Sequence, residues 1–218
     1  MKNKKGQMFI IAAITIVTVL VLIKTGLNLT QIIENKRALE NNLEKLEFEN
    51  FRNEIANSIS ISANSTESIS PNVVSFVEFS KTIFGGKNAK LQGIFVGSLY
   101  NDAIPNLDER LNITVYNFFD SPLDRINLNF SSNPLSNQTF DNISPGSSVA
   151  TNFTFNVNTN RNFSLHIYYK NNFESGRTEN VTILVELNKT KFVGFFDVRV
   201  AGSKTEQRDR FYQTFDIN

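Results

Sequence analysis

The 218-residue chain contains no cysteine, no tryptophan and a single histidine, His166. Without cysteine it has no thiol nucleophile, disulfide, thiolate zinc site or iron–sulfur ligand. One histidine excludes two-histidine metal motifs and leaves one imidazole for acid–base catalysis. The net charge of +1 argues against general nucleic-acid binding, which requires a basic surface. We therefore expect a non-enzymatic protein with no catalytic residue, metal, cofactor, nucleic-acid partner or small-molecule substrate.

Three local patterns resemble sites of chemistry. Gly85-Gly86-Lys87 lacks the first glycine and the final Ser/Thr of a phosphate loop, so we expect a turn there. His166 lies between two apolar residues of a predicted strand, which places it on the outer face. Six carboxylates lie in predicted loops and could be calcium ligands: Asp102, Asp108, Glu109, Asp120, Asp124 and Asp141. Their spacing is not that of an EF-hand, so we expect them to be solvated turn residues.

The N-terminus carries a long apolar run. Three lysines lie within residues 1–5, residues 8–23 are uncharged, and Lys24 ends the run. Extended to Leu29, a helix of this length crosses a hydrocarbon core of about 30 Å. The preceding lysines place the N-terminus in the cytoplasm and the rest of the chain outside. We therefore expect a transmembrane segment over 8–29. A buried core helix and a cleaved secretory signal peptide are the alternatives, although no small-x-small cleavage site closes the run.

The residues before this run, Lys4-Lys5-Gly6-Gln7, resemble the leader junction of archaeal type IV pilin-like proteins, the class III signal peptides. The resemblance implies that a prepilin peptidase removes the leader 1–6 by cutting after Gly6, which leaves Gln7 as the mature N-terminus. It also implies that the apolar helix packs with other pilin-like subunits or with copies of itself. Many pilins have an assembly glutamate at the fifth mature position, where this chain has Ile11. A membrane anchor that is never cut is the alternative.

The helical pattern continues beyond the membrane segment, and we expect one helix over 7–60. No proline or glycine interrupts residues 29–59, and apolar residues fall on one helix face: Ile32, Leu39, Leu43, Leu46, Phe51, Ile55 and Ile59. The irregular spacing disfavours a coiled coil with a second copy and favours packing against the downstream domain. Residues 61–90 are predicted to form a linker and a short helix that starts at Ser70-Pro71 and ends at Gly85-Gly86, with a strand as the alternative.

From residue 91 the apolar period changes to two, which predicts strands. The expected strands are 91–100, 111–119, 126–131, 149–157, 162–170, 180–188, 191–201 and 210–217, each half apolar, with a charged turn over 207–210. The predicted fold is α+β: a long N-terminal membrane-spanning and amphipathic helix, followed over 91–218 by an antiparallel β-sandwich of immunoglobulin-like or jelly-roll type. Three aromatic residues would mark subunit contacts if they point outward: Phe118, Tyr168 and Phe195.

The chain has 30 asparagines and ten N-x-S/T sequons, where chance gives about five. In several sequons the middle residue is apolar and faces inward, so the asparagine faces outward, where a glycan can be attached. Asparagine-rich coding bias is the alternative, and Asn28 lies too close to the predicted bilayer. The candidate N-glycosylation sites are therefore Asn64, Asn112, Asn129, Asn137, Asn142, Asn152, Asn162, Asn180 and Asn188.

Taken together, these patterns predict a pilin-like cell-surface structural protein. Its helix would contact membrane lipid or the core of an extracellular filament, and its β-domain would be extracellular and glycosylated. The alternative is a single-pass anchored β-domain that works alone as an adhesion or binding module, or as an accessory subunit. An extracytoplasmic hydrolase is a third class, which loss of hydrolysis on mutating His166 would support.

Overall fold

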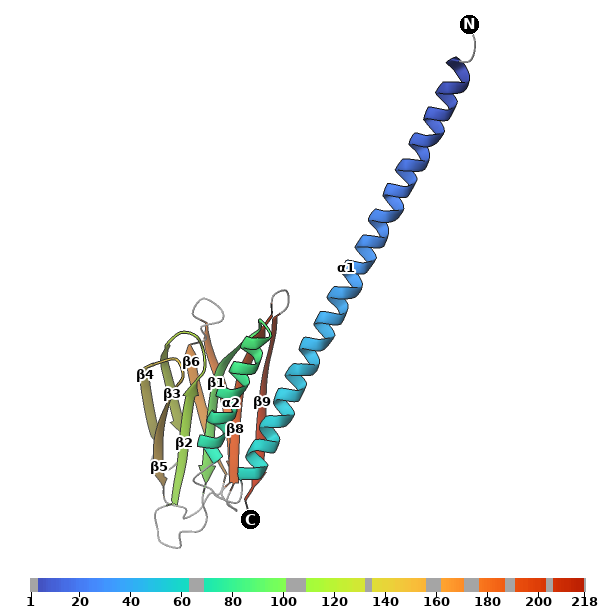
Figure 1. Cartoon of the computed structure of the whole chain (residues 1–218). Helices are drawn as coiled ribbons and strands as arrows, with labels where there is room; N and C mark the ends of the chain where they lie inside the picture. The colour runs from blue at the N-terminus through green and yellow to red at the C-terminus, as the bar shows by residue number, and fades with distance from the viewer. Residues whose placement is uncertain are drawn as a thin grey trace. The chain divides into compact units, whose positions relative to one another are not determined.

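The computed structural model describes residues 4–62, 69–100, 109–131, 135–155, 162–170, 177–186, 191–202 and 206–217. The chain divides into two compact units, Met1–Glu47 and Phe48–Asn218. The fold is α+β: an N-terminal helix is followed by a short helix and two antiparallel sheets (Figure 1).

Helix α1 runs from Lys4 to Ser62. It begins three residues before the predicted start and includes Lys4, Lys5 and Gly6 of the predicted leader. Its last residue, Ser62, donates a hydrogen bond from its hydroxyl to the Ser58 carbonyl at 2.7 Å. The same hydroxyl accepts one from the Asn72 side chain at 2.8 Å. The end of α1 is therefore tied to the next helix.

Helix α2 spans Ile69–Gly86, in agreement with the predicted helix rather than the alternative strand. Its buried residues Ile69, Val73 and Val77 recur every four positions and form one apolar face. Beyond its end, Asn88 adopts a left-handed conformation with φ of 56°. This reversal lets the amide of Ala89 donate to the Phe84 carbonyl at 2.9 Å, as at many helix C-termini.

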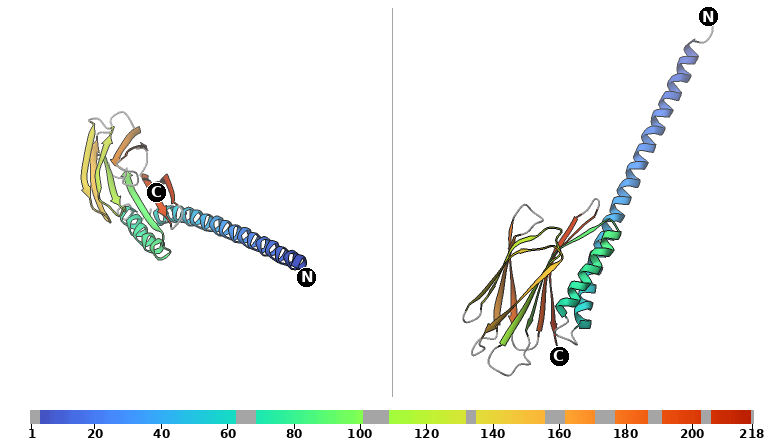
Figure 2. Two further views of the ribbon diagram at one scale, coloured as in Figure 1. Left: turned by 90° about the horizontal axis from the view of Figure 1, so that it is seen from above. Right: turned by 60° about the vertical axis from the view of Figure 1, so that its left-hand side comes forward.

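The described residues form nine strands in two sheets. The strands are β1 Lys90–Tyr100, β2 Glu109–Asn117, β3 Leu123–Phe130, β4 Ser136–Ile143, β5 Ser147–Phe155, β6 Asn162–Lys170, β7 Thr178–Glu186, β8 Lys191–Ala201 and β9 Glu206–Asp216. One sheet has the order β5-β2-β1-β8-β9 and the other has the order β4-β3-β6-β7, with every pairing antiparallel. The chain changes sheet after β2, β4, β5 and β7 (Figure 2).

The sequence predicted eight strands and missed β4. Strand β4 lies at the edge of the four-stranded sheet, and most of its side chains are exposed or half-buried. An edge strand of this kind needs few apolar residues, so the alternation that predicted the other strands is weak here. The last strand starts at Glu206 instead of 210, because the predicted charged turn over 207–210 is part of β9.

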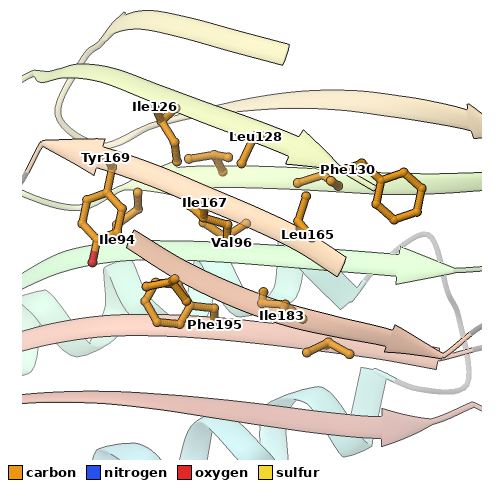
Figure 3. Close-up of a cluster of buried hydrophobic side chains, with 14 of the residues drawn as sticks. Ile94, Val96, Ile126, Leu128, Phe130, Leu165, Ile167, Tyr169, Ile183 and Phe195 are labelled. Atoms are coloured by element: carbon orange, nitrogen blue, oxygen red, sulfur yellow. The ribbon is translucent and has the colours of Figure 1, made fainter. Parts of the chain in front are cut away.

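Two hydrophobic cores flank the five-stranded sheet. The core between the sheets contains Ile94 and Val96 from one sheet and Leu128, Leu165 and Ile167 from the other (Figure 3). The second core lies between the outer face of the five-stranded sheet and two helical segments, α2 and residues 48–62 of α1 (Figure 2). Strands β1 and β8 are therefore buried on both faces, which corrects the expectation that each strand is half apolar.

Burial also corrects two of the aromatic expectations. Phe118 is fully buried in the helix–sheet core, and Phe195 is fully buried between the sheets. Only Tyr168 is partly exposed. Of the three residues, Tyr168 alone is available for an external contact.

The apolar stripe of α1 is covered over one part of its length. Phe51, Ile55 and Ile59 are buried in the helix–sheet core, as the sequence predicted. Ile32 and Leu46, which belong to the same stripe, are exposed. Among the stripe residues whose side chains the structure describes, packing against the downstream domain accounts for Phe51, Ile55 and Ile59, whereas Ile32 and Leu46 are exposed.

Candidate functional site

One segment of α1, Ile14–Lys36, is long and apolar enough to cross a membrane. Its 23 residues give about 35 Å of helix, against a hydrocarbon core of about 30 Å. None of this segment is buried within the protein, and Leu20 and Leu22 are 59% and 65% exposed. An apolar helix surface of this length needs a cover of lipid or of other helices.

Three threonines of this segment are hydrogen-bonded within the helix. The hydroxyls of Thr18, Thr25 and Thr30 donate to the carbonyls four residues earlier, at 2.8–3.0 Å. A threonine bonded in this way presents mainly its methyl group to the surroundings and tolerates an apolar environment. At the predicted cleavage junction, the backbone of Lys4, Lys5, Gly6 and Gln7 is helical, and their side chains lie outside the described part.

The outer face of the four-stranded sheet is polar and carries several sequon residues. One row crosses all four strands through the register pairs Asn137–Asn129, Asn129–His166 and His166–Thr182. The next row runs through Thr139, Asn127, Tyr168 and Asn180. These residues alternate with Leu128 and Ile167 of the inter-sheet core, so they face outward, as the sequence predicted for His166.

Neighbouring side chains on this face are bonded to one another. Thr139 donates to the Asn127 amide oxygen at 2.8 Å, and His166 Nδ1 lies 3.0 Å from the Thr182 hydroxyl. Thr139 and Thr182 are the hydroxyl residues of the sequons at Asn137 and Asn180. The Thr182 hydroxyl is therefore a hydrogen-bonding neighbour of the His166 imidazole across the β6–β7 pair.

The candidate glycosylation sites differ in exposure. Asn112, Asn137, Asn142, Asn152 and Asn180 are exposed. Asn129 is half-buried, and its side-chain oxygen is buried without a hydrogen-bond partner among the described residues. The backbone of Asn162 lies in β6, and its side chain is outside the described part. Asn64 and Asn188 lie outside the described residues.

Register and turn geometry separate these sites further. Asn112 on β2 lies directly opposite Asn152 on β5, so two sequons share one rung of the ladder. Asn142 has φ of 53° and falls between the paired residues Asp141 and Ile143 at the end of β4. The Gly146 turn follows it.

Sequence reasoning missed a buried ionic cluster between the sheets. Asp197 on β8 is fully buried, and Glu179 on β7 is 7% exposed. Arg208 of β9 contacts Asp197 at 2.7 Å and Glu179 at 3.2 Å, and Arg210 contacts Glu179 at 2.6 Å. Tyr169 of β6 donates its hydroxyl to Asp197. The cluster therefore joins β8 and β9 to the opposite sheet.

The cluster raises the pKa values of its tyrosine and of Arg208. Burial and the neighbouring Asp197 carboxylate raise the pKa of Tyr169 far above its usual value, so the phenol stays neutral. The hydrogen bond to Asp197 raises the pKa of Arg208. A cleft of about 320 Å³ is lined by Arg208, Asp209 and Arg210. Because both arginines are engaged with carboxylates, they supply structural links rather than a free anion site.

The exposed carboxylates weighed as calcium ligands are paired with cations. Asp141 contacts Arg125 at 2.6 Å, Asp124 contacts Lys170 at 2.8 Å and Asp120 contacts Lys90 at 3.6 Å. Within the described ranges, no three His, Asp or Glu side chains come together as metal ligands would. Asp102 and Asp108 lie outside these ranges, and the side chain of Glu109 is not described.

No protein-family model matches the chain, and a search of curated proteins finds no match.

Proposed function

We propose that this protein is a pilin-like surface subunit. The first part of α1 anchors it in the membrane or packs in a filament core, and the β-domain is displayed outside the cell. The carrying observation is the exposed, 23-residue apolar segment Ile14–Lys36, which follows a lysine-rich N-terminus. The positive-inside rule then places the N-terminus in the cytoplasm and the domain outside.

Three further features support this reading. The Lys4-Lys5-Gly6-Gln7 junction precedes the apolar segment, as a class III leader does, so a prepilin peptidase would cut after Gly6. The later part of α1 supplies core residues to the domain, so anchor and domain share one helix. Strands β1, β2 and β5 lie in one sheet, together with β8 and β9, and strands β3, β4, β6 and β7 form the other. This distribution favours the immunoglobulin-like type over the jelly roll.

The role proposed is structural and needs no catalytic residue or cofactor. The absence of cysteine suits it, because the domain holds together outside the cell through its two apolar cores and the ionic cluster. The sequons would then be exposed to glycosylation outside the cell.

N-terminal mass analysis of the full chain from the cells that make it tests the processing step. We expect a mature chain that starts at Gln7, and a Gly6→Val variant that keeps Met1. An intact Met1 in the wild-type membrane fraction would contradict cleavage by a prepilin peptidase and would leave the proposed membrane anchoring unaffected.

Topology is tested separately, because a chain without cysteine accepts single-cysteine labels. We expect Ser148→Cys, which is exposed on β5, to react with a membrane-impermeant maleimide on intact cells. In the uncut Gly6→Val background, we expect Asn3→Cys to react only after lysis. The reverse pattern would contradict the proposed orientation.

A second candidate function is a singly acting, membrane-anchored binding module. It is favoured by Ile11, which occupies the position of the assembly glutamate in many pilins. Electron microscopy of sheared surface material with an antibody to the β-domain separates the two. Labelled filaments support assembly, and label confined to the membrane supports the single module.

A further inference from the structure

Four of the sequons form two direct cross-strand pairs. Asn129 of β3 lies opposite Asn137 of β4, and Asn112 of β2 lies opposite Asn152 of β5. The Cβ atoms of directly opposed residues in an antiparallel pair are about 4.5–5.5 Å apart. A sugar ring is about as wide as this spacing, so two glycans attached to one rung compete for the same space.

We propose that each of these sequon pairs carries one glycan in the folded protein, and that in the first pair the glycan is on Asn137. This inference rests on the extracellular placement of the domain proposed above. It goes further by assigning which asparagines are modified, which the sequons alone leave open.

The transfer has a defined chemistry. The side-chain nitrogen of the asparagine bonds to the anomeric carbon of an oligosaccharide carried on a lipid phosphate. The bond from that carbon to the phosphate oxygen breaks, one amide proton is released, and the lipid phosphate leaves. The product amide still lies on the strand, so the attached sugar must fit beside its cross-strand neighbour.

The first pair is unequal because of its place in the sheet. Asn137 is exposed on the edge strand β4, whereas Asn129 lies on the inner strand β3 between Asn137 and His166. Asn129 is also less exposed than Asn137, and its side-chain oxygen is buried without a hydrogen-bond partner among the described residues. The hydroxyl of its sequon, on Ser131, is also occupied, since it accepts a hydrogen bond from the Ser164 amide at 2.7 Å.

The second pair is close to equal. Asn112 and Asn152 are both exposed, and they project from the outer face of the five-stranded sheet, opposite to their core neighbours Ile113 and Phe153. Either asparagine can therefore hold a glycan, and occupancy of one blocks the other. If both are modified before folding, the β2–β5 ladder cannot close without a clash.

Glycopeptide mass spectrometry of the full chain, purified from the membrane or surface fraction of the cells that make it, tests the proposal. Trypsin cuts after Arg125 and Arg161, so Asn129 and Asn137 stay on one peptide and can be compared on the same molecule. We expect sugar at Asn137 with Asn129 near zero. We also expect the fractional occupancies of Asn112 and Asn152 to sum to one or less.

Matched variants separate the two pairs. Asn112→Gln should raise occupancy at Asn152 about twofold, because it removes the competitor. Asn137→Gln should remove the glycan of its pair without moving it to Asn129. Thr139→Val, which destroys the same sequon but keeps Asn137, should give the same result. Asn142→Gln is the control, since Asn142 lies outside both pairs and its loss should leave all four occupancies unchanged.

Two outcomes would overturn the inference. Sugar at both members of a pair on one molecule, or substantial sugar at Asn129, would show that the ladder does not restrict attachment, while the proposed surface location would stand. A complete lack of sugar at every sequon would overturn this inference and the glycosylated surface together, and the maleimide labelling would then decide whether the domain is outside at all.

Discussion

Arg208 on β9 holds both carboxylate oxygens of Asp197 on β8, with Nε 2.9 Å from Oδ1 and Nη2 2.7 Å from Oδ2. The register pairs Asp197 with Arg210, so Arg208 reaches its partner diagonally along the ladder. Asp197 has no exposed surface, and the two-pronged contact compensates a charge that burial would otherwise make costly. The contact also fixes the side chain that accepts the Tyr169 hydrogen bond from the other sheet.

We expect Arg208→Ala to lower the free energy of unfolding by about 3–5 kcal/mol, because it leaves a buried carboxylate short of its main partner. Near-UV circular dichroism during denaturant unfolding of the full chain in detergent micelles measures this. The control is Arg125→Ala, whose partner Asp141 is exposed, and it should cost less than about 1 kcal/mol. Equal losses in the two variants would contradict the structural role of the cluster.

The raised pKa of Tyr169 links folding to alkaline pH. The folded state keeps the phenolic proton to a higher pH than the unfolded state, whose pKa is about 10. Its contribution is therefore fully present below about pH 10 and is lost as the pH rises toward the folded pKa. We expect wild-type stability to fall with pH above about 10 more steeply than that of Tyr169→Phe, measured by denaturant unfolding from pH 8 to 11. Parallel pH profiles would show that Tyr169 titrates alike in both states.

The helices and most strands were predictable because their signals are local. A long apolar run, an uninterrupted helical stripe and alternation of period two depend only on neighbouring residues, and they located α1, α2 and eight of the nine strands. Strand β4 escaped because its pairing with β3, and not its own apolar content, holds it in the sheet.

The ionic cluster and the double burial of β1 depend on contacts between residues far apart in the chain. Asp197 becomes buried because residues of β6, β7 and β9 contact it or its partners. Arg208 and Arg210 alternate along one face of β9, and this alternation indicates a strand, but the sequence predicted a charged turn there. Asn117 illustrates the same limit among the asparagines. It is fully buried, and its amide donates at 2.8 Å to the carbonyl of Ile143, which lies 26 residues further along the chain.

Gly93 of β1 lies where the packing leaves no room for a side chain. A Cβ atom there would lie 2.1 Å from the Asp197 carbonyl oxygen and 2.7 Å from the Phe118 ring. The oxygen belongs to the backbone of the paired strand, so it cannot move without opening the β1–β8 ladder. We expect Gly93→Ala to destabilise the domain by about 3 kcal/mol or more. Thermal unfolding followed by near-UV circular dichroism measures the change.

The matched control is Gly85→Ala. A Cβ atom at Gly85 meets nothing within 4 Å, and alanine favours a helix over glycine by about 1 kcal/mol. This variant should therefore be neutral or slightly more stable. A similar loss in both variants would show that glycine content, and not the close approach at Gly93, sets the effect.

The end of α1 is part of the β-domain core, so this helix contributes to the stability of the domain. Ile55 is fully buried against the five-stranded sheet, and Arg52 lies 5.1 Å from the Phe211 ring and 3.6 Å from Asp209 of β9. We expect Ile55→Ala to cost about 2–5 kcal/mol, since it leaves a cavity between helix and sheet. Leu46→Ala, earlier on the same helix, should lower the free energy of unfolding far less, because Leu46 is exposed. Denaturant unfolding of both variants in the full chain gives the comparison.

If the two losses were equal, the helix would contribute only its own helicity and the sheet would be stable without it. If Ile55→Ala alone is destabilising, a variant that lacks residues 48–62 should expose the aromatic face of β1 and β8 and aggregate, because this part of α1 covers that face in the helix–sheet core.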